Sequence, residues 1–234
     1  MIELLAVEGL AKTFTLHLHG GRKLAVVAGV SFVVGPGECV VLGGPSGVGK
    51  SSILKIVYGN YAADAGRIWL ADGSRVLDIA TAGPADIVAA RRRTMGYVSQ
   101  FLRVIPRVSA LDIVAAAARD AGLEAPAARA RAEHLLERLH LPRALWPLPP
   151  ATFSGGEQQR VNIARGFAGE HRLLILDEPT ASLDAANRDA VVDLIDERRS
   201  QGAGFLAIFH DEDVRARVAA RIVDVSAFSQ REAA

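Results

Sequence analysis

The sequence predicts an α/β domain with a parallel core sheet, an antiparallel β-subdomain and an inserted α-helical lobe. Three short apolar runs have the length and composition of strands buried on both faces. These runs occupy residues 39–43, 173–176 and 205–209. Residues 2–34 instead alternate apolar and polar side chains around a Gly20-Gly21 turn, which is typical of antiparallel strands. A chain of 234 residues exceeds one average domain without supplying two independent cores, so we expect a single domain over 1–234.

Between these runs the pattern alternates between strand and helix. The expected elements are a helix directly after Gly49, strands at 66–70 and 75–79, a helix at 84–93 and a strand at 94–100. A helical segment at 185–201 would cross over between the last two core strands. The sequence therefore predicts helices that cover a parallel sheet.

The segment from about 101 to 168 is rich in Ala, Leu and Arg at helical spacing. Its clearest helical stretch covers 127–141, where Leu135, Leu136 and Leu139 share one face. We expect this segment to form the helical lobe inserted in the domain.

Composition excludes several classes of protein. The 27 basic and 26 acidic residues leave a net charge of +1, so we expect no direct contact with nucleic acid. The single cysteine, Cys39, lies in an apolar run and is expected in the core, which fits a reducing, cytoplasmic setting. Glu3 and Glu8 interrupt the first apolar residues, so we expect no N-terminal targeting segment. Apolar runs elsewhere fall short of the roughly 18 residues of a membrane span, so we expect no transmembrane segment.

A glycine-rich loop between the first core strand and the next helix has the pattern of a phosphate cradle. Its residues are Gly44, Pro45, Ser46, Gly47, Val48, Gly49, Lys50 and Ser51, and Ser52 follows in the helix. The glycines let backbone N–H groups approach phosphates, and the helix N-terminus adds partial positive charge. Lys50 would reach the β- and γ-phosphates and Ser51 would bind Mg²⁺. The loop therefore predicts a P-loop NTPase fold that binds ATP with Mg²⁺. An ordinary glycine-rich turn would not need an apolar strand before it and a helix directly after it.

Two carboxylates, Asp177 and Glu178, end the apolar strand at 173–176. Asp177 would hold Mg²⁺ directly or through water, and Glu178 would activate the attacking water as a general base. Such a pair is weak evidence alone, because many strand-end carboxylates are solvated or cap a helix. The phosphate cradle in the same chain makes the catalytic interpretation the stronger one.

A second anion site is expected at Ser154, Gly155 and Gly156, where a hydroxyl and two glycines open a helix. Here the sequence resembles the ATP-binding-cassette (ABC) ATPase family, whose signature loop occupies this place, with Phe153 and Glu157 departing from the usual Leu and Gln. The resemblance implies that two cassettes, as a homodimer or with a related subunit, pair head to tail. Each signature loop would then close on the partner's γ-phosphate. The simpler reading is a capped helix start.

The resemblance extends to further positions along the chain. It implies that Gln100 senses Mg²⁺ and takes part in catalysis, that Asp184 lies in a loop crossing the dimer, and that His210 is the γ-phosphate switch. Phe14 matches an aromatic residue that stacks on adenine. Singly, each has a plain alternative: a polar strand end, a helix cap, a histidine at a strand terminus and a core phenylalanine. His17 and His19 share a face of a strand, but the lack of a third ligand argues against zinc.

Three functions are compatible with these motifs. The stretches at 99–111 and 152–167, with Phe209 before His210, resemble the accessory ATPase of the phosphonate carbon-phosphorus lyase system, which implies a soluble phosphonate-lyase complex as partner. The alternative is the nucleotide-binding subunit of an exporter-like membrane transporter. A soluble cassette acting on nucleic acid or ribosomes is disfavoured by the lack of a second cassette or basic tail.

A partner surface is expected beside Gln100. Four apolar residues with flanking arginines suit a protein interface, although they would also pack under the helical lobe. They are Phe101, Leu102, Val104 and Ile105, with Arg103 and Arg107. The run Arg91-Arg92-Arg93 is expected to be a solvated face or a contact for an acidic partner.

Overall fold

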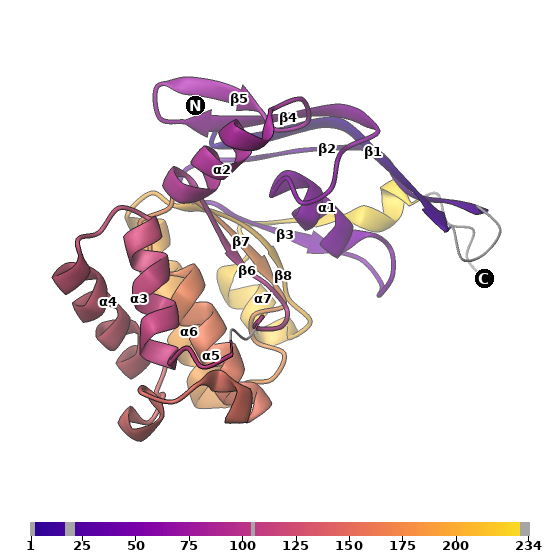
Figure 1. Cartoon of the computed structure of the whole chain (residues 1–234). Coiled ribbons are helices and arrows are strands. Elements are labelled where there is room, and N and C mark those ends of the chain that lie inside the picture. Colours follow the sequence, from indigo (N-terminus) through magenta and orange to yellow (C-terminus); the bar gives the residue numbers. More distant parts are fainter. Residues whose placement is uncertain (1–2, 17–21, 104–105, 230–234) are drawn as a thin grey trace.

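The computed structural model describes residues 3–16, 22–103 and 106–229. The described strands are β1 (Leu5–Leu16), β2 (Arg22–Val34), β3 (Cys39–Gly43), β4 (Ala65–Asp72), β5 (Arg75–Asp78), β6 (Met95–Val98), β7 (Leu173–Asp177), β8 (Gly204–Ile208) and β9 (Arg221–Asp224). The α-helices are α1 (Lys50–Val57), α2 (Pro84–Arg93), α3 (Ala110–Asp120), α4 (Ala125–Arg138), α5 (Gly155–Gly166), α6 (Ala185–Ser200) and α7 (Glu212–Val218). Figure 1 shows the antiparallel strands at one end and α3 to α6 at the other.

In the described residues the strands form two sheets. An antiparallel sheet has the order β2-β1-β4-β5, and a parallel sheet has the order β6-β7-β8-β3-β9. Because parallel strands present their carboxyl ends at one edge, the residues that follow β3, β6, β7 and β8 are brought together there. The predicted fold class is confirmed. The turn expected at Gly20-Gly21, and His17 and His19, lie outside the described residues.

Strands β3, β7 and β8 of the parallel sheet are buried on both faces, and their alternate residues enter two separate cores. In β7, Leu173 and Ile175 pack toward the antiparallel sheet and α1, whereas Leu174 and Leu176 pack toward the helices on the other face. Cys39 is fully buried in the core on the helical side of the sheet, as predicted, and burial raises the pKa of its thiol to about 12. A continuous apolar run in these strands thus reflects two covered faces.

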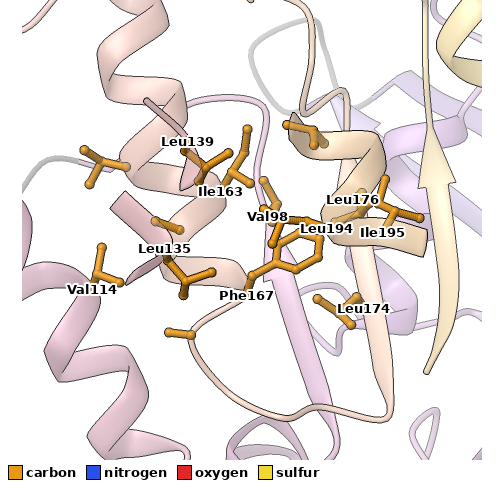
Figure 2. Close-up of a cluster of buried hydrophobic side chains, with 14 of the residues drawn as sticks. Val98, Val114, Leu135, Leu139, Ile163, Phe167, Leu174, Leu176, Leu194 and Ile195 are labelled. Carbon is orange, nitrogen blue, oxygen red and sulfur yellow. The ribbon is translucent and has the colours of Figure 1, made fainter. Parts of the chain in front are cut away.

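The helical side of the sheet holds the larger of the two cores. Figure 2 shows its centre, where Phe167 lies among residues of the sheet, α5 and α6, with Val114 and Leu135 approaching from α3 and α4. Helix α5 approaches β6 closely at Gly166, where an added Cβ would lie 2.3 Å from the Val98 side chain. This close contact positions α5 on the sheet, and with it the loop that begins the helix at Ser154, Gly155 and Gly156, called the signature-like loop below.

Several boundaries differ from those expected, mostly by one or two residues, and two short elements were not predicted. Helix α4 covers Ala125–Arg138 rather than 127–141, because Pro126 is accommodated in its first turn and His140 takes a left-handed φ of 53° just beyond its end. Strand β6 ends at Val98, so the chain leaves the sheet before Gln100. Helix α7 and strand β9 are short elements that the sequence pattern does not reveal.

No helix in the described part of the chain is both long and apolar enough to span a bilayer.

Candidate active site

The loop between β3 and α1 has the backbone that a phosphate cradle requires. Gly44, Gly47 and Gly49 adopt φ values of 114°, 81° and 114°, which side chains disfavour. At Gly49 an added Cβ would also lie 2.7 Å from the Val26 side chain. The loop therefore brings bare backbone to the N-terminus of α1, where free N–H groups favour an anion.

Lys50 is folded back onto this loop. Its Nζ donates to the carbonyl oxygens of Gly44 at 2.6 Å and Pro45 at 2.8 Å. Burial lowers the pKa of Lys50, and the nearby charge of Glu178 opposes that shift. The ammonium thus lies inside the cradle, held by weak partners that phosphate oxygens can replace.

Asp177, at the end of β7, joins three elements. Its Oδ1 accepts a hydrogen bond from Ser51 Oγ at 2.9 Å, and its Oδ2 accepts one from Tyr97 Oη at 3.2 Å. Burial raises the pKa of Asp177, while the bonds from Ser51 and Tyr97 lower it. A hydroxyl and a carboxylate this close are hard oxygen donors that suit Mg²⁺, which takes few protein ligands and fills its shell with phosphate and water.

Glu178 lies at the centre of a second group. Its Oε1 is 2.8 Å from His210 Nε2 and its Oε2 accepts from Gln100 Nε2 at 3.0 Å. The backbone of Glu178 has a left-handed φ of 53°, and its N–H donates to Ile208 O at 3.1 Å. Strained backbone of this kind recurs at functional sites. Three residues that the sequence separates widely are therefore in direct contact.

These groups surround one cavity of about 300 Å³. Its described lining residues are Val26, Ser46, Gly47, Gly49, Lys50, Ser51, Ser52, Glu178 and His210. Six of the nine come from the cradle and its helix, Val26 comes from β2, and Glu178 and His210 complete the lining. The arrangement can hold a phosphate chain between α1 and a carboxylate that accepts a proton.

The signature-like loop is a capped helix start in the isolated chain. Ser154 Oγ accepts from the N–H of Glu157 at 3.4 Å, while the N–H and hydroxyl of Ser154 both donate to Glu157 Oε2 at 2.8 Å. Gly155 has open space where a side chain would be, and Gly156 lies against the carbonyl of Ser182. Among described residues, the loop does not line the cavity, so a phosphate role for it requires a second molecule.

Asp184 and Phe14 also lie away from the described cavity lining. Asp184 caps α6, accepting from the backbone N–H of Asn187 at 2.9 Å, and this bond lowers the pKa of the carboxyl. Phe14 packs edge-on against Tyr61 with ring centres 5.4 Å apart. The dimer-crossing and adenine-stacking roles stay predictions.

The sequence analysis missed Tyr97, whose hydroxyl contacts Asp177. A tyrosine near the carboxyl end of an expected buried strand was the available signal, because a buried hydroxyl needs a partner. Val26 was also missed, since nothing in a β-strand valine distinguishes it from a core residue.

A larger cleft of about 890 Å³ reaches Asp177, between the sheet and the helical side. Gln100, Tyr97 and Asp177 form part of its wall. Its lining carries few acidic side chains but five positively charged ones, which are Lys55, Arg91, Arg92, Arg103 and Arg165. The cleft is therefore suited to an acidic occupant.

Two expectations about this surface need correction. Arg91 is not a solvated side chain, because it donates to Tyr58 O at 3.0 Å and its guanidinium lies 4.4 Å from the Tyr58 ring centre. Leu102 is 8% exposed and belongs to the core, so it adds nothing to the predicted patch, whereas Phe101 is 73% exposed and lines the cleft. Val104 and Ile105 lie outside the described residues.

The family of the chain follows from sequence comparison. Residues 27–181 match the family model described as "ABC transporter". A lipoprotein-releasing system ATP-binding protein, LolD, from Hyphomonas neptunium is 38% identical over 212 residues, covering 90% of this chain and 88% of its own length. The chain belongs to the ABC transporter family, as an ATP-binding cassette.

Other proteins are similar to the chain in sequence, and a solved structure is similar to it in fold. LolD 1 of Caulobacter vibrioides is 36% identical and covers 95% of this chain and 92% of its own length. A macrolide export ATP-binding/permease protein, MacB 1/2, of Paracoccus denitrificans is 35% identical over 88% of this chain, which spans only 30% of that protein. Among solved structures, a dimeric bacterial ABC transporter cassette superposes with a TM-score of 0.85 over 97% of both chains, at 24% identity, which supports the fold.

Proposed function

We propose that this chain is the ATP-hydrolysing subunit of an exporter-type membrane transporter. The observation that carries the proposal is that Lys50, Ser51, Glu178 and His210 line one cavity. Asp177 is hydrogen-bonded to Ser51 and Gln100 to Glu178 at its edge. The relatives named for lipoprotein release and macrolide export favour a transporter over the phosphonate-lyase role. The inferred location is the cytoplasmic face of a membrane.

In this mechanism the phosphates of ATP lie along the N-terminus of α1, and Lys50 exchanges two loop carbonyls for phosphate oxygens. Ser51 and Asp177 would hold Mg²⁺, which neutralises charge on the β- and γ-phosphates. Gln100 and His210 orient the two oxygens of Glu178. Water attacks the γ-phosphorus, its proton passes to Glu178, and the bond to the ADP oxygen breaks, giving ADP and phosphate.

A second cassette completes the proposed site. Ser154 and Gly156 are not among the described residues that line the cavity of their own chain, and the hydroxyl of Ser154 is oriented by its contact with Glu157. The partner's site would receive this helix N-terminus, whose N–H groups suit a γ-phosphate. ATP then acts as the bridge between two chains.

The basic cleft is the proposed contact for the membrane partner. It opens beside Gln100, so an acidic cytoplasmic segment bound there would lie next to the residue that contacts Glu178. In the phosphonate alternative, a soluble enzyme subunit would take that place.

Co-purification separates the two functions. The chain would be expressed with the multi-span membrane protein whose gene lies nearest and, separately, with phosphonate-lyase subunits of the same organism. Stable recovery with the membrane protein, together with ATPase activity stimulated by it, is expected. Recovery only with the soluble subunits, and loss of growth on an alkylphosphonate when the gene is deleted, would instead support the phosphonate role.

A further inference from the structure

Tyr97 lines the basic cleft and is hydrogen-bonded to Asp177, which lines it too. It lies on β6, which pairs in parallel with β7, and its hydroxyl reaches Asp177 Oδ2 across the pair. The other carboxylate oxygen, Oδ1, accepts from Ser51. Each oxygen of Asp177 therefore has its own hydroxyl donor, and the two donors come from different elements.

The Tyr97 ring is held firmly enough to orient its hydroxyl. It stacks on Tyr58 with ring centres 4.7 Å apart and an interplanar angle of 23°. The guanidinium of Arg91 lies 4.4 Å from the centre of the Tyr58 ring, and its Nε donates a hydrogen bond to the carbonyl oxygen of Tyr58. Next to Tyr97, Gly96 leaves no space for a side chain, because an added Cβ would lie 2.9 Å from His171 Nδ1. The ring and its backbone are thus restrained from both sides.

The terminal torsion angle of an aspartate side chain has a broad preferred range, so a carboxylate held by only one hydrogen-bond donor can rotate. Outer partners that orient a metal ligand often matter nearly as much as the ligand itself. In the bond between Tyr97 and Asp177 the hydroxyl is the donor and the carboxylate the acceptor.

We propose that Tyr97 is a positioning residue for Asp177: its hydroxyl fixes the carboxylate so that the oxygen beside Ser51 is presented to the divalent cation that accompanies nucleotide. This inference rests on the proposed ATPase function and its Mg²⁺ site. It predicts that removing one oxygen atom from Tyr97 weakens cation binding while nucleotide binding without the cation is preserved.

The test uses Tyr97→Phe with Tyr58→Phe as the matched control. Both remove one hydroxyl from the same stacked pair, and only the first removes a bond to Asp177. Mn²⁺ replaces Mg²⁺ as a paramagnetic probe, and its dissociation constant in the presence of ADP is measured by electron paramagnetic resonance. ADP affinity is measured separately in EDTA, and thermal unfolding without nucleotide reports whether the ring still packs.

We expect Tyr97→Phe to raise the Mn²⁺ dissociation constant roughly tenfold. ADP affinity in EDTA and the unfolding temperature should stay at the wild-type values, and Tyr58→Phe should match the wild type throughout. Equal Mn²⁺ affinity in wild type and Tyr97→Phe would overturn the inference, as would an equal loss in both variants, which would indicate ring packing. If the wild type itself shows no nucleotide-dependent Mn²⁺ binding, the proposed function fails instead.

Discussion

At the scale of single residues, the most informative side chain is Glu178. Its left-handed backbone, its two side-chain partners and its position at the cavity all follow from the end of β7 meeting the ends of β6 and β8. Lys50 is equally specific, since its buried ammonium donates to two loop carbonyls and could exchange them for the oxygens of an anion.

The first prediction concerns Lys50. Wild-type protein with Mg-ATP at 100 times its dissociation constant should gain about 2.7 kcal/mol of unfolding free energy by mass action. Lys50→Ala should lose this gain, because the cradle then lacks its charge for the β- and γ-phosphates. Thermal unfolding with and without Mg-ATP measures it, and Lys23→Ala, at an exposed lysine on β2, is the control. A full ATP-dependent shift in Lys50→Ala would remove Lys50 from the site.

At the scale of elements, Asp72 joins the antiparallel sheet to the start of the parallel one. Its fully buried carboxylate accepts from Thr94 at 2.6 Å, just before β6, and also from Arg75 and Arg93. Burial acts to raise the pKa of Asp72, but the bonds from Thr94, Arg93 and Arg75 outweigh it and lower the pKa. The carboxylate is therefore stabilised in its charged form by three groups, one on β5 and two at the end of α2.

The second prediction is that Asp72→Asn destabilises the fold by about 1–3 kcal/mol at neutral pH. Because the folded pKa lies below the ordinary value of 3.8, the contribution is complete above about pH 5 and disappears as the pH falls through the folded pKa. Urea unfolding at pH 7 and in acid should show the difference from wild type shrinking. Asp86→Asn is the control, since Asp86 meets the same Arg75 in an exposed pair. A difference that does not change with pH would contradict this account.

At the scale of the whole molecule, the helix start at Ser154 is not among the described residues that line the cavity beside Lys50. The proposed head-to-tail model therefore needs a second molecule to bring such a helix start to the cavity. The basic cleft is the proposed contact for a different partner.

The third prediction is that nucleotide forms the pair. Glu178→Gln removes the general base but keeps the side-chain shape, so ATP should bind without turnover and the dimer should accumulate. Light scattering at saturating Mg-ATP measures the mass, and Glu178→Gln combined with Lys50→Ala should stay monomeric. A strictly monomeric Glu178→Gln, also after mixing with related cassettes, would contradict the head-to-tail model.

The fourth prediction separates two arginines that the sequence analysis treated together. Arg103 lines the cleft, whereas Arg107 is exposed and is not among its described lining residues. Arg103→Glu should weaken co-purification with the partner several-fold without changing basal ATPase activity, because it reverses a charge facing an acidic segment. Arg107→Glu should leave both unchanged. Equal loss in the two variants would argue against the cleft as the contact.

The fold class, the phosphate cradle and the carboxylate pair could be predicted from the amino-acid sequence, because each depends on local spacing. Helix α2 was predicted with both its ends correct, since Pro84 begins it and the polar pattern ends with Arg93. Which distant groups meet could not be predicted, because it depends on how the strands are ordered in the sheet. The contacts of Glu178 with Gln100 and His210, and of Asp177 with Tyr97, join separate strands whose order in the sheet no local pattern encodes. The burial of Leu102 beside the exposed Phe101 was decided in the same way, by what packs on each side of one short loop.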